Sequence, residues 1–204
     1  MDGGQHTFPA ENADRLEDAA ARYRRLSAEE LAWGLDCPVD GTVLEVGSGT
    51  GFYLDDVAAR AERALGLDVQ PAMHAHYRRK GVPGNVALVT GSGADLPFSD
   101  ASVATAYLTM TYHELPREAA ISEVARVLVA GGRLVVADWS ADGEGAAGPP
   151  LAERFTAGDV AEKLRAEGFR VVHGAVRPET FLVVAERERG GTASEREREG
   201  TPTP

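Results

Sequence analysis

Short apolar runs alternate with amphipathic stretches through the middle of the chain. Five runs rich in β-branched and other apolar residues have the length of buried strands, at residues 42–46, 64–68, 86–90, 103–109 and 133–138. Between most of these runs, apolar residues recur every three or four positions, which predicts helices over residues 51–63, 71–79 and 117–128. Strands and helices in this order predict a parallel sheet with right-handed crossovers and both faces covered.

The pattern changes after the fifth predicted strand. Residues 140–150 are rich in glycine and proline and are long enough for a lid or a binding loop. A helix is expected from its cap at Thr156 to Glu167, followed by β-rich runs at 169–176 and 180–187. The turn between these runs is so short that they must pair antiparallel. The fold class is therefore α/β: a doubly wound, mostly parallel seven-stranded sheet with a C-terminal antiparallel hairpin and N-terminal helices.

The two ends of the chain differ from its middle. Residues 1–40 are polar with helical spacing, and Ser27 with Glu30 forms a capping-box signature for a second short helix. We expect these residues to form a helical cap on one α/β domain at 41–187. Residues 188–204 contain no large apolar side chain and are expected to be a disordered, charged tail.

Charge limits the kind of partner. The 204 residues contain 32 acidic and 21 basic side chains, for a net charge of −11. Such a surface repels phosphate backbones, so a nucleic-acid substrate is disfavoured. Lys80 and Lys163 are the only lysines. An acidic chain poor in lysine is typical of adaptation to high salt, although a GC-rich genome would also favour arginine.

The remaining composition points to a cytoplasmic protein by default. Cys37 is the only cysteine, which excludes an intrachain disulfide and a cysteine-rich metal site. No apolar run has the length of a membrane span, and the N-terminus lacks the pattern of a secretory signal. His74 and His76 point to different sides of one predicted helix and do not form a metal pair; surface or packing roles are expected. No metal site is predicted.

A glycine-rich turn carries the sharpest chemical signal. The sequence Val-Leu-Glu-Val-Gly-Ser-Gly-Thr-Gly, from Val43 to Gly51, runs from a buried strand into a helix. Glycines there let the backbone turn tightly and approach a ligand. A dinucleotide site requires G-x-G-x-x-G, whereas here the third glycine comes one position early. Glu45 would also repel a pyrophosphate and suits a cationic amino or sulfonium group instead.

Two aspartates follow at the ends of later strands. Asp68, seventeen residues after Gly51, can accept hydrogen bonds from both hydroxyls of a ribose. Asp95 follows the third strand and can accept from an exocyclic amine, while a neighbouring backbone N–H can donate to a ring nitrogen. These positions favour a ligand that contains a ribose and a nitrogen ring with an exocyclic amine.

Together these pieces resemble the class I S-adenosylmethionine-dependent methyltransferases. The matching motifs are Glu-Val-Gly-Ser-Gly-Thr-Gly at 45–51, Leu-Gly-Leu-Asp at 65–68, Ala-Asp-Leu-Pro-Phe at 94–98, Tyr-His-Glu-Leu at 112–115 and the stretch 126–138. The resemblance covers roughly residues 40–187, and it includes the final hairpin. It implies that 41–187 is a methyltransferase domain with S-adenosylmethionine as cofactor and S-adenosylhomocysteine as product.

The resemblance also implies roles for individual residues. The methionine part would be held by Glu45 and by the glycine turn, namely Gly47, Ser48, Gly49 and Gly51. The ribose would be held by Asp68, and the adenine would be recognised by Ala94 and Asp95. Thr109, just past the fourth strand, would lie near the methionine amino group.

The catalytic prediction rests on a single histidine. Methyl transfer needs an aligned acceptor, and a base only where the acceptor must lose a proton. His113 lies in the loop after the fourth strand, on the edge where such sheets bind ligands, and is the candidate base. It could instead cap the following helix or pack against Tyr112. Relatives often carry two histidines here, and Glu114 replaces the second.

We expect a small-molecule acceptor, because no large inserted domain follows the fifth strand. Candidate substrate-lining residues are Tyr53, Tyr112, Asp138, Trp139 and Arg154. A non-catalytic cofactor-binding protein on the same fold is the main alternative, followed by a nicotinamide-dependent oxidoreductase. The acceptor atom and the oligomeric state are left open.

Overall fold

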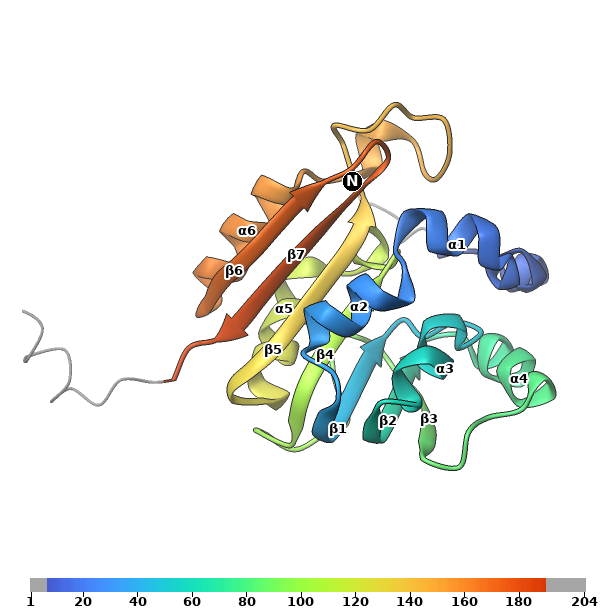
Figure 1. Ribbon diagram of the computed structural model, residues 1–204, viewed down its shortest axis with the longest axis horizontal. Helices are drawn as coiled ribbons and strands as arrows, with labels where there is room; N and C mark the ends of the chain where they lie inside the picture. The colour runs from blue at the N-terminus through green and yellow to red at the C-terminus, as the bar shows by residue number, and fades with distance from the viewer. Residues whose placement is uncertain (1–6, 190–204) are drawn as a thin grey trace, which may run out of the picture.

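A computed structural model describes residues 7–189 and contains one seven-stranded sheet (Figure 1). The strands are β1 (Val39–Val46), β2 (Ala61–Asp68), β3 (Val86–Thr90), β4 (Val103–Thr109), β5 (Leu128–Trp139), β6 (Phe169–Val176) and β7 (Thr180–Arg187). Their spatial order is β3-β2-β1-β4-β5-β7-β6. Strands β1 to β5 are parallel, and β7 runs antiparallel to both β5 and β6, which confirms the predicted fold class.

Helices cover both faces of this sheet. The helical elements are η1 (Ala10–Glu17), α1 (Ala19–Arg25), α2 (Ala28–Leu35), α3 (Phe52–Ala58), α4 (Pro71–Lys80), η2 (Tyr112–Glu114), α5 (Arg117–Val127), η3 (Leu151–Glu153) and α6 (Ala157–Ala166). Apolar side chains of α2, α3 and α4 pack on one face, and those of α5 and α6 on the other. The carboxyl ends of the parallel strands β1 to β5 lie together at one end of the sheet, which we call the carboxyl edge.

Several of the expected element boundaries were wrong, and β1 begins at Val39 instead of residue 42. The helix predicted over 51–63 ends at Ala58, because residues from Ala61 onward pair with β1 and extend β2. Glu62 and Arg63 have good helix propensity, but sheet pairing outweighs it. Strand β5 begins at Leu128 rather than Arg133, since Leu128 pairs with Val103 of β4 before a shift in register.

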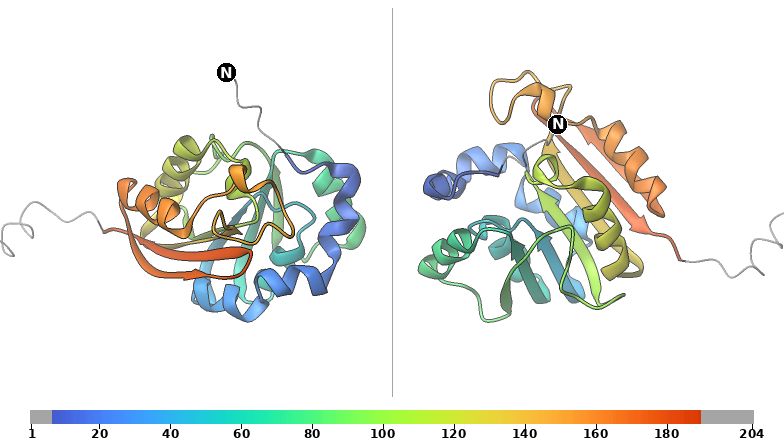
Figure 2. Two further views of the ribbon diagram at one scale, coloured as in Figure 1. Left: turned by 90° about the horizontal axis from the view of Figure 1, so that it is seen from above. Right: turned by 180° about the vertical axis from the view of Figure 1, so that it is seen from behind.

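The N-terminal helical region is divided at Asp18. The 3-10 helix η1 ends there, and the Asp18 side chain accepts a hydrogen bond of 3.0 Å from the backbone of Ala21 to begin α1. The expected capping box of Ser27 and Glu30 is present at the start of α2. In Figure 2, left, the loop over residues 140–150 lies over the carboxyl ends of the strands and η1 and α1 lie beside them, whereas α2 packs on one face of the sheet.

No helix within residues 7–189 is long and apolar enough to cross a membrane.

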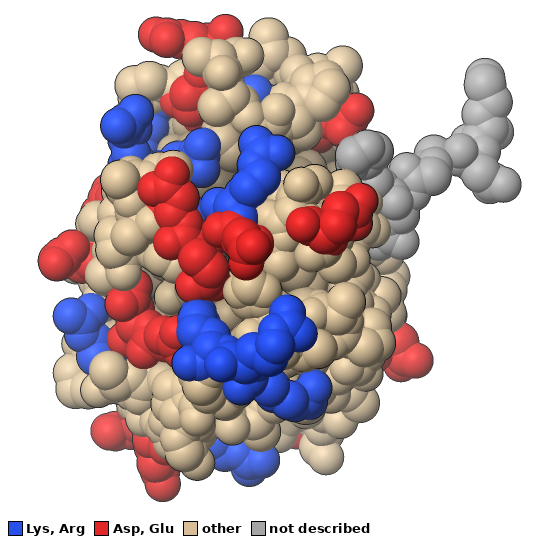
Figure 3. Space-filling model, turned by 90° about the vertical axis from the view of Figure 1, so that its right-hand side faces the viewer, with Lys and Arg blue, Asp and Glu red and all other residues tan. Residues whose placement is uncertain are grey.

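Charged side chains of both signs are mixed on the surface. On the face shown in Figure 3, basic side chains lie among acidic ones. The Lys80 ammonium, for example, pairs with Glu17 at 3.1 Å and Asp55 at 3.0 Å. Apart from residues 188 and 189, the predicted tail lies outside the described residues.

Candidate active site

The glycine turn joins β1 to α3 at the carboxyl edge. The backbone N–H groups of Gly47 and Ser48 both donate to the carbonyl of Leu67, which fixes the turn against β2. Gly47 and Gly51 have φ values of +77° and +78°. A Cβ at Gly47 would lie 2.2 Å from the Thr111 side chain, and one at Gly51 would lie 2.0 Å from the Tyr77 ring. Both positions therefore require glycine.

Asp68 ends β2 beside this turn. One carboxylate oxygen accepts from the Gly49 N–H and the other from the Gln70 N–H, each at 2.8 Å. The side chain is nearly buried, yet each carboxylate oxygen has a second lone pair that a hydroxyl group can use. This arrangement fits the predicted role of Asp68 as ribose acceptor.

Glu45 is buried at the end of β1. One carboxylate oxygen accepts from the Thr109 hydroxyl at 2.8 Å and the other from the Tyr107 hydroxyl at 3.2 Å. Burial raises the pKa of Glu45 to about 8, although the Thr109 hydrogen bond and the charge of Arg22 act in the opposite direction. A buried carboxylate with so high a pKa is suited to a cationic ligand group, which would stabilise its charged form.

The predicted adenine-binding segment also reaches this edge. A Cβ at Gly93 would contact Val46 and Leu115, so the segment lies beside the end of β1. Ala94 is half-buried and the side chain of Asp95 is exposed. That carboxylate makes no hydrogen bond within the described part of the chain and is available to a ligand.

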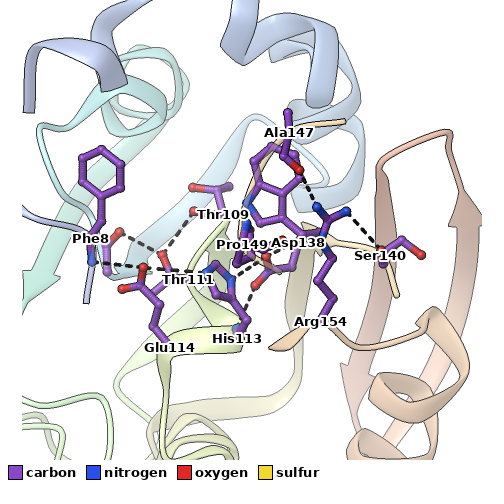
Figure 4. Close-up of polar contacts among 12 residues, drawn as sticks. Phe8, Thr109, Thr111, His113, Glu114, Asp138, Ser140, Ala147, Pro149 and Arg154 are labelled. Atoms are coloured by element: carbon purple, nitrogen blue, oxygen red, sulfur yellow. Dashed lines mark hydrogen bonds and ion pairs between the residues drawn. The ribbon is translucent and has the colours of Figure 1, made fainter. Parts of the chain in front are cut away.

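His113, which follows β4, and Asp138, near the end of β5, form a pair at the carboxyl edge (Figure 4). The Nδ1 atom of His113 lies 2.8 Å from Oδ1 of Asp138, and its backbone N–H donates to Oδ2 at 2.9 Å. Because a carboxylate only accepts, Nδ1 carries the proton, and Nε2 is the acceptor in the neutral ring. Burial lowers the pKa of His113, but the hydrogen bond and charge of Asp138 outweigh it and raise the pKa above its usual value.

Residues 7–9, which we call the N-terminal strap, cross over this edge. The Phe8 N–H donates to the Glu114 carboxylate at 3.2 Å, and the Phe8 carbonyl accepts from the Gln70 side chain at 2.9 Å. Glu114 follows β4 and Gln70 follows β2, so the strap connects the two parts of the site. Burial raises the pKa of Glu114.

Trp139 lies between two arginines at the end of β5. The guanidinium of Arg25 is 4.7 Å from the Trp139 ring centroid, and that of Arg154 is 5.3 Å from it. The Arg154 guanidinium donates to the carbonyls of Pro149, Ser140 and Ala147 and pairs with Glu179 at 2.9 Å. Arg154 therefore holds the 140–150 loop in place, and its predicted contact with substrate stays a prediction.

Two predicted substrate residues are packed in the cores. The Tyr53 hydroxyl donates to the carbonyls of Arg22 and Leu26, and its ring is buried under α1. Tyr112 is buried against Phe155. The structure thus places neither ring at an open surface of the edge, and a substrate contact for either stays a prediction.

Two residues support the glycine turn: Thr111, which the sequence analysis missed, and His74, for which it expected only a surface or packing role. The Thr111 hydroxyl lies 3.3 Å from the Gly47 carbonyl, and the Thr111 side chain covers that glycine. His74 is fully buried, with ring nitrogens 3.3 Å from the Ser48 hydroxyl and 3.4 Å from the Thr90 hydroxyl. Neither residue belongs to a recognisable motif, and only their spatial neighbours reveal their function as supports of the glycine turn.

Comparison with known proteins places this chain in a family. Residues 44–136 match the family described as "Methyltransferase domain". The chain is 30% identical over 179 residues to the O-methyltransferase rstn1 of Aspergillus nomiae, covering 79% of this chain and 77% of that protein. It is 36% identical over 106 residues to the ubiquinone/menaquinone biosynthesis C-methyltransferase UbiE of Sinorhizobium fredii, covering 48% and 41%. A SAM-dependent methyltransferase structure from Aquifex aeolicus superposes with a TM-score of 0.77 at 27% identity, covering 89% and 100%.

The chain belongs to the class I S-adenosylmethionine-dependent methyltransferases. S-adenosylmethionine is accordingly its cofactor, and the Glu45 carboxylate, the glycine turn and Asp68 fit that molecule's ammonium and ribose groups. The chain spans about half or less of the length of the first curated relatives that it matches.

Proposed function

We propose that the protein transfers a methyl group from S-adenosylmethionine to a small-molecule acceptor. The observation that carries the proposal is that Glu45 and Asp68 lie on one side of the carboxyl edge while the His113–Asp138 pair lies on the adjoining side. A cofactor site and a candidate proton acceptor thus share one edge. The O- and C-methyltransferases among the relatives support this class of reaction.

The chain's own residues have distinct parts in this reaction. When bound, S-adenosylmethionine supplies an electrophilic methyl group on a sulfonium centre. Glu45 binds the ammonium and Asp68 the ribose, which fixes the direction in which an acceptor must approach. Asp138 holds the His113 ring with Nε2 unprotonated, and that atom takes the proton of an acceptor hydroxyl or amine.

A small acceptor is favoured by how the site is covered. The N-terminal strap and the 140–150 loop lie over the edge, and Arg154 fixes that loop through three backbone carbonyls. Neither the N-terminal strap nor the 140–150 loop is a large inserted domain of the kind that could bind a macromolecule. The acidic net charge of −11 also disfavours nucleic acid.

Thermal unfolding with added ligands tests the proposal first. A ligand at a hundred times its dissociation constant adds about 2.7 kcal/mol of stability, seen as a rise of a few degrees. S-adenosylmethionine and S-adenosylhomocysteine should each produce that rise, and NADH should not. Methyl transfer from labelled cofactor to a panel of small phenols, acids and amines then tests turnover. Binding without transfer to any acceptor would favour the non-catalytic alternative.

A further inference from the structure

Two arginines of α1, Arg22 and Arg25, lie beside the site, and the charge of Arg22 acts on the buried Glu45. Arg22 and Arg25 are three positions apart and lie on the same side of the helix. The Arg22 guanidinium lies 4.6 Å from the Tyr53 ring centroid and 5.4 Å from that of Phe52, next to the glycine turn. The Arg25 guanidinium lies against Trp139, next to Asp138. One guanidinium thus lies near Phe52 and Tyr53, which follow the glycine turn, and the other lies near Trp139 at the end of β5.

Neither guanidinium has a carboxylate partner within residues 7–189. Among the other partly buried arginines of the described chain, Arg126, Arg133, Arg154 and Arg177 have one, whereas Arg117 and Arg187 do not. The Nε atom of Arg22 is buried and makes no hydrogen bond within that range. The side chains of Arg22 and Arg25 therefore keep N–H donors that no carboxylate of residues 7–189 uses.

The two positive charges also act on each other. Burial lowers the pKa of Arg25, and the charge of Arg22 lowers it further. A partly desolvated pair of like charges is unfavourable unless an anion lies near both groups. Aromatic rings under each guanidinium provide some compensation, but they do not use its N–H donors.

We propose that Arg22 and Arg25 form a carboxylate-binding site beside the cofactor. The proposal rests on the proposed function and deepens it. A planar carboxylate matches the paired N–H donors of a guanidinium. Two sources have this chemistry: the α-carboxylate of the cofactor, which lies next to the ammonium bound by Glu45, and an acidic group on the acceptor. In the first case the pair positions the cofactor, and in the second it selects acidic acceptors.

The test compares Arg22→Gln and Arg25→Gln with Arg24→Gln, a matched control on the exposed side of the same helix. Calorimetry measures the binding of S-adenosylhomocysteine and of 5′-methylthioadenosine, which lacks the amino-acid group. Benzoate and benzamide are titrated into the protein both alone and saturated with S-adenosylhomocysteine. Thermal unfolding without ligand shows that each variant is folded.

Each outcome decides the proposal. A loss of about tenfold or more in S-adenosylhomocysteine affinity, with unchanged methylthioadenosine affinity, would assign the pair to the cofactor carboxylate. Benzoate binding that Arg25→Gln or Arg22→Gln abolishes, without binding of benzamide, would assign it to the acceptor. Variants that match the wild type toward all four probes, or an equal effect of Arg24→Gln, would overturn the proposal.

The proposed function can fail separately. If the wild type does not bind S-adenosylhomocysteine, that result contradicts the proposed function and not the arginine site. Benzoate binding to the protein without added cofactor still tests the pair in that case. Loss of that binding in the two variants would support the site, and its absence in the wild type would overturn it.

Discussion

Glu45, one residue before the end of β1, and Thr109, the last residue of the neighbouring strand β4, are joined by a hydrogen bond of 2.8 Å from the hydroxyl to the buried carboxylate. Because burial raises the pKa of Glu45 to about 8, this carboxyl group holds a proton at neutral pH in the unliganded protein. A bound ammonium group would make that protonation unfavourable. The hydrogen bond thus belongs to a site whose charge depends on its ligand.

Cofactor binding should therefore release a proton. At pH 7 we expect on the order of one proton per S-adenosylhomocysteine bound, because Glu45 ionises as the ammonium group arrives. Calorimetry in two buffers of different ionisation enthalpy measures this number directly. Glu45→Gln should bind more weakly and release none. Equal heats in both buffers for the wild type would contradict the expectation.

The same group should influence stability without ligand. Its pKa is higher in the folded protein than the ordinary value of 4.5, so the folded state binds more protons between those two values. Stability should therefore fall as the pH rises from about 5 to 8, by at most about 1.4 kcal/mol per pH unit. Denaturant unfolding across this range should show a shallower slope for Glu45→Gln.

Removal of the Asp68 carboxylate should weaken cofactor binding. Asp68→Ala leaves the ribose hydroxyls and the N–H groups of Gly49 and Gln70 without their acceptor, at a cost of about 1–3 kcal/mol. The dissociation constant of S-adenosylhomocysteine should rise by the corresponding factor, roughly 5 to 150. Asp100→Ala, an exposed aspartate paired with Arg126, is the control and should bind normally. An unchanged affinity in Asp68→Ala would remove this residue from the site.

The His113–Asp138 pair predicts a pH dependence of turnover. A base must be neutral, so kcat/KM should fall as the pH drops through the raised pKa of His113. Asp138→Asn removes the charge that stabilises the imidazolium and should move this fall to lower pH. His113→Ala should lose turnover while binding S-adenosylhomocysteine as the wild type does. A pH profile that does not move in Asp138→Asn would exclude His113 as the base.

Asp138 should also contribute to stability in a pH-dependent way. The raised pKa of His113 means that the stabilising pair is fully formed below the ordinary histidine pKa of about 6.5 and is lost as the pH rises through the folded value. Asp138→Asn should consequently lose more stability at pH 6 than at pH 9. Unfolding in denaturant at the two pH values gives the comparison.

High salt is expected to stabilise the protein. Its net charge of −11 produces repulsion that salt screens over a few ångström at molar concentration. The thermal midpoint should rise as KCl increases from about 0.1 M toward molar concentrations. A flat or falling midpoint would remove the proposed adaptation to salt and leave genome composition as the explanation for the scarce lysine.

Much of the fold could be predicted because its signals are local. The strand–turn–helix at Glu45–Gly51 and the hairpin around residues 177–179 each depend on neighbours in the sequence. The errors arose where distant pairing decides the conformation. Arg63 lies in a helix-favouring stretch, yet it pairs with Thr42 of β1. Leu128 was assigned to a helix, but it pairs with Val103 of β4.

The site was less predictable than the fold for the same physical reason. The position of Asp68 beside the glycine turn could be predicted because its spacing from that turn follows from the strand–helix–strand repeat. The function of Arg154 in the loop depends on carbonyl groups of Ser140, Ala147 and Pro149, which have no side-chain signature. The contact of Phe8 with Glu114 joins residues 106 positions apart, and no periodicity predicts such a pairing.

The N-terminal strap has a practical consequence for work with this protein. A peptide joined directly to residue 7 would be attached next to Phe8, which bonds to Gln70 and Glu114 at the site. Strand β7 runs the other way and ends at Arg187, at the opposite edge of the sheet (Figure 1). Purification tags and surface-immobilisation handles therefore belong at the C-terminal end, where they leave ligand entry free.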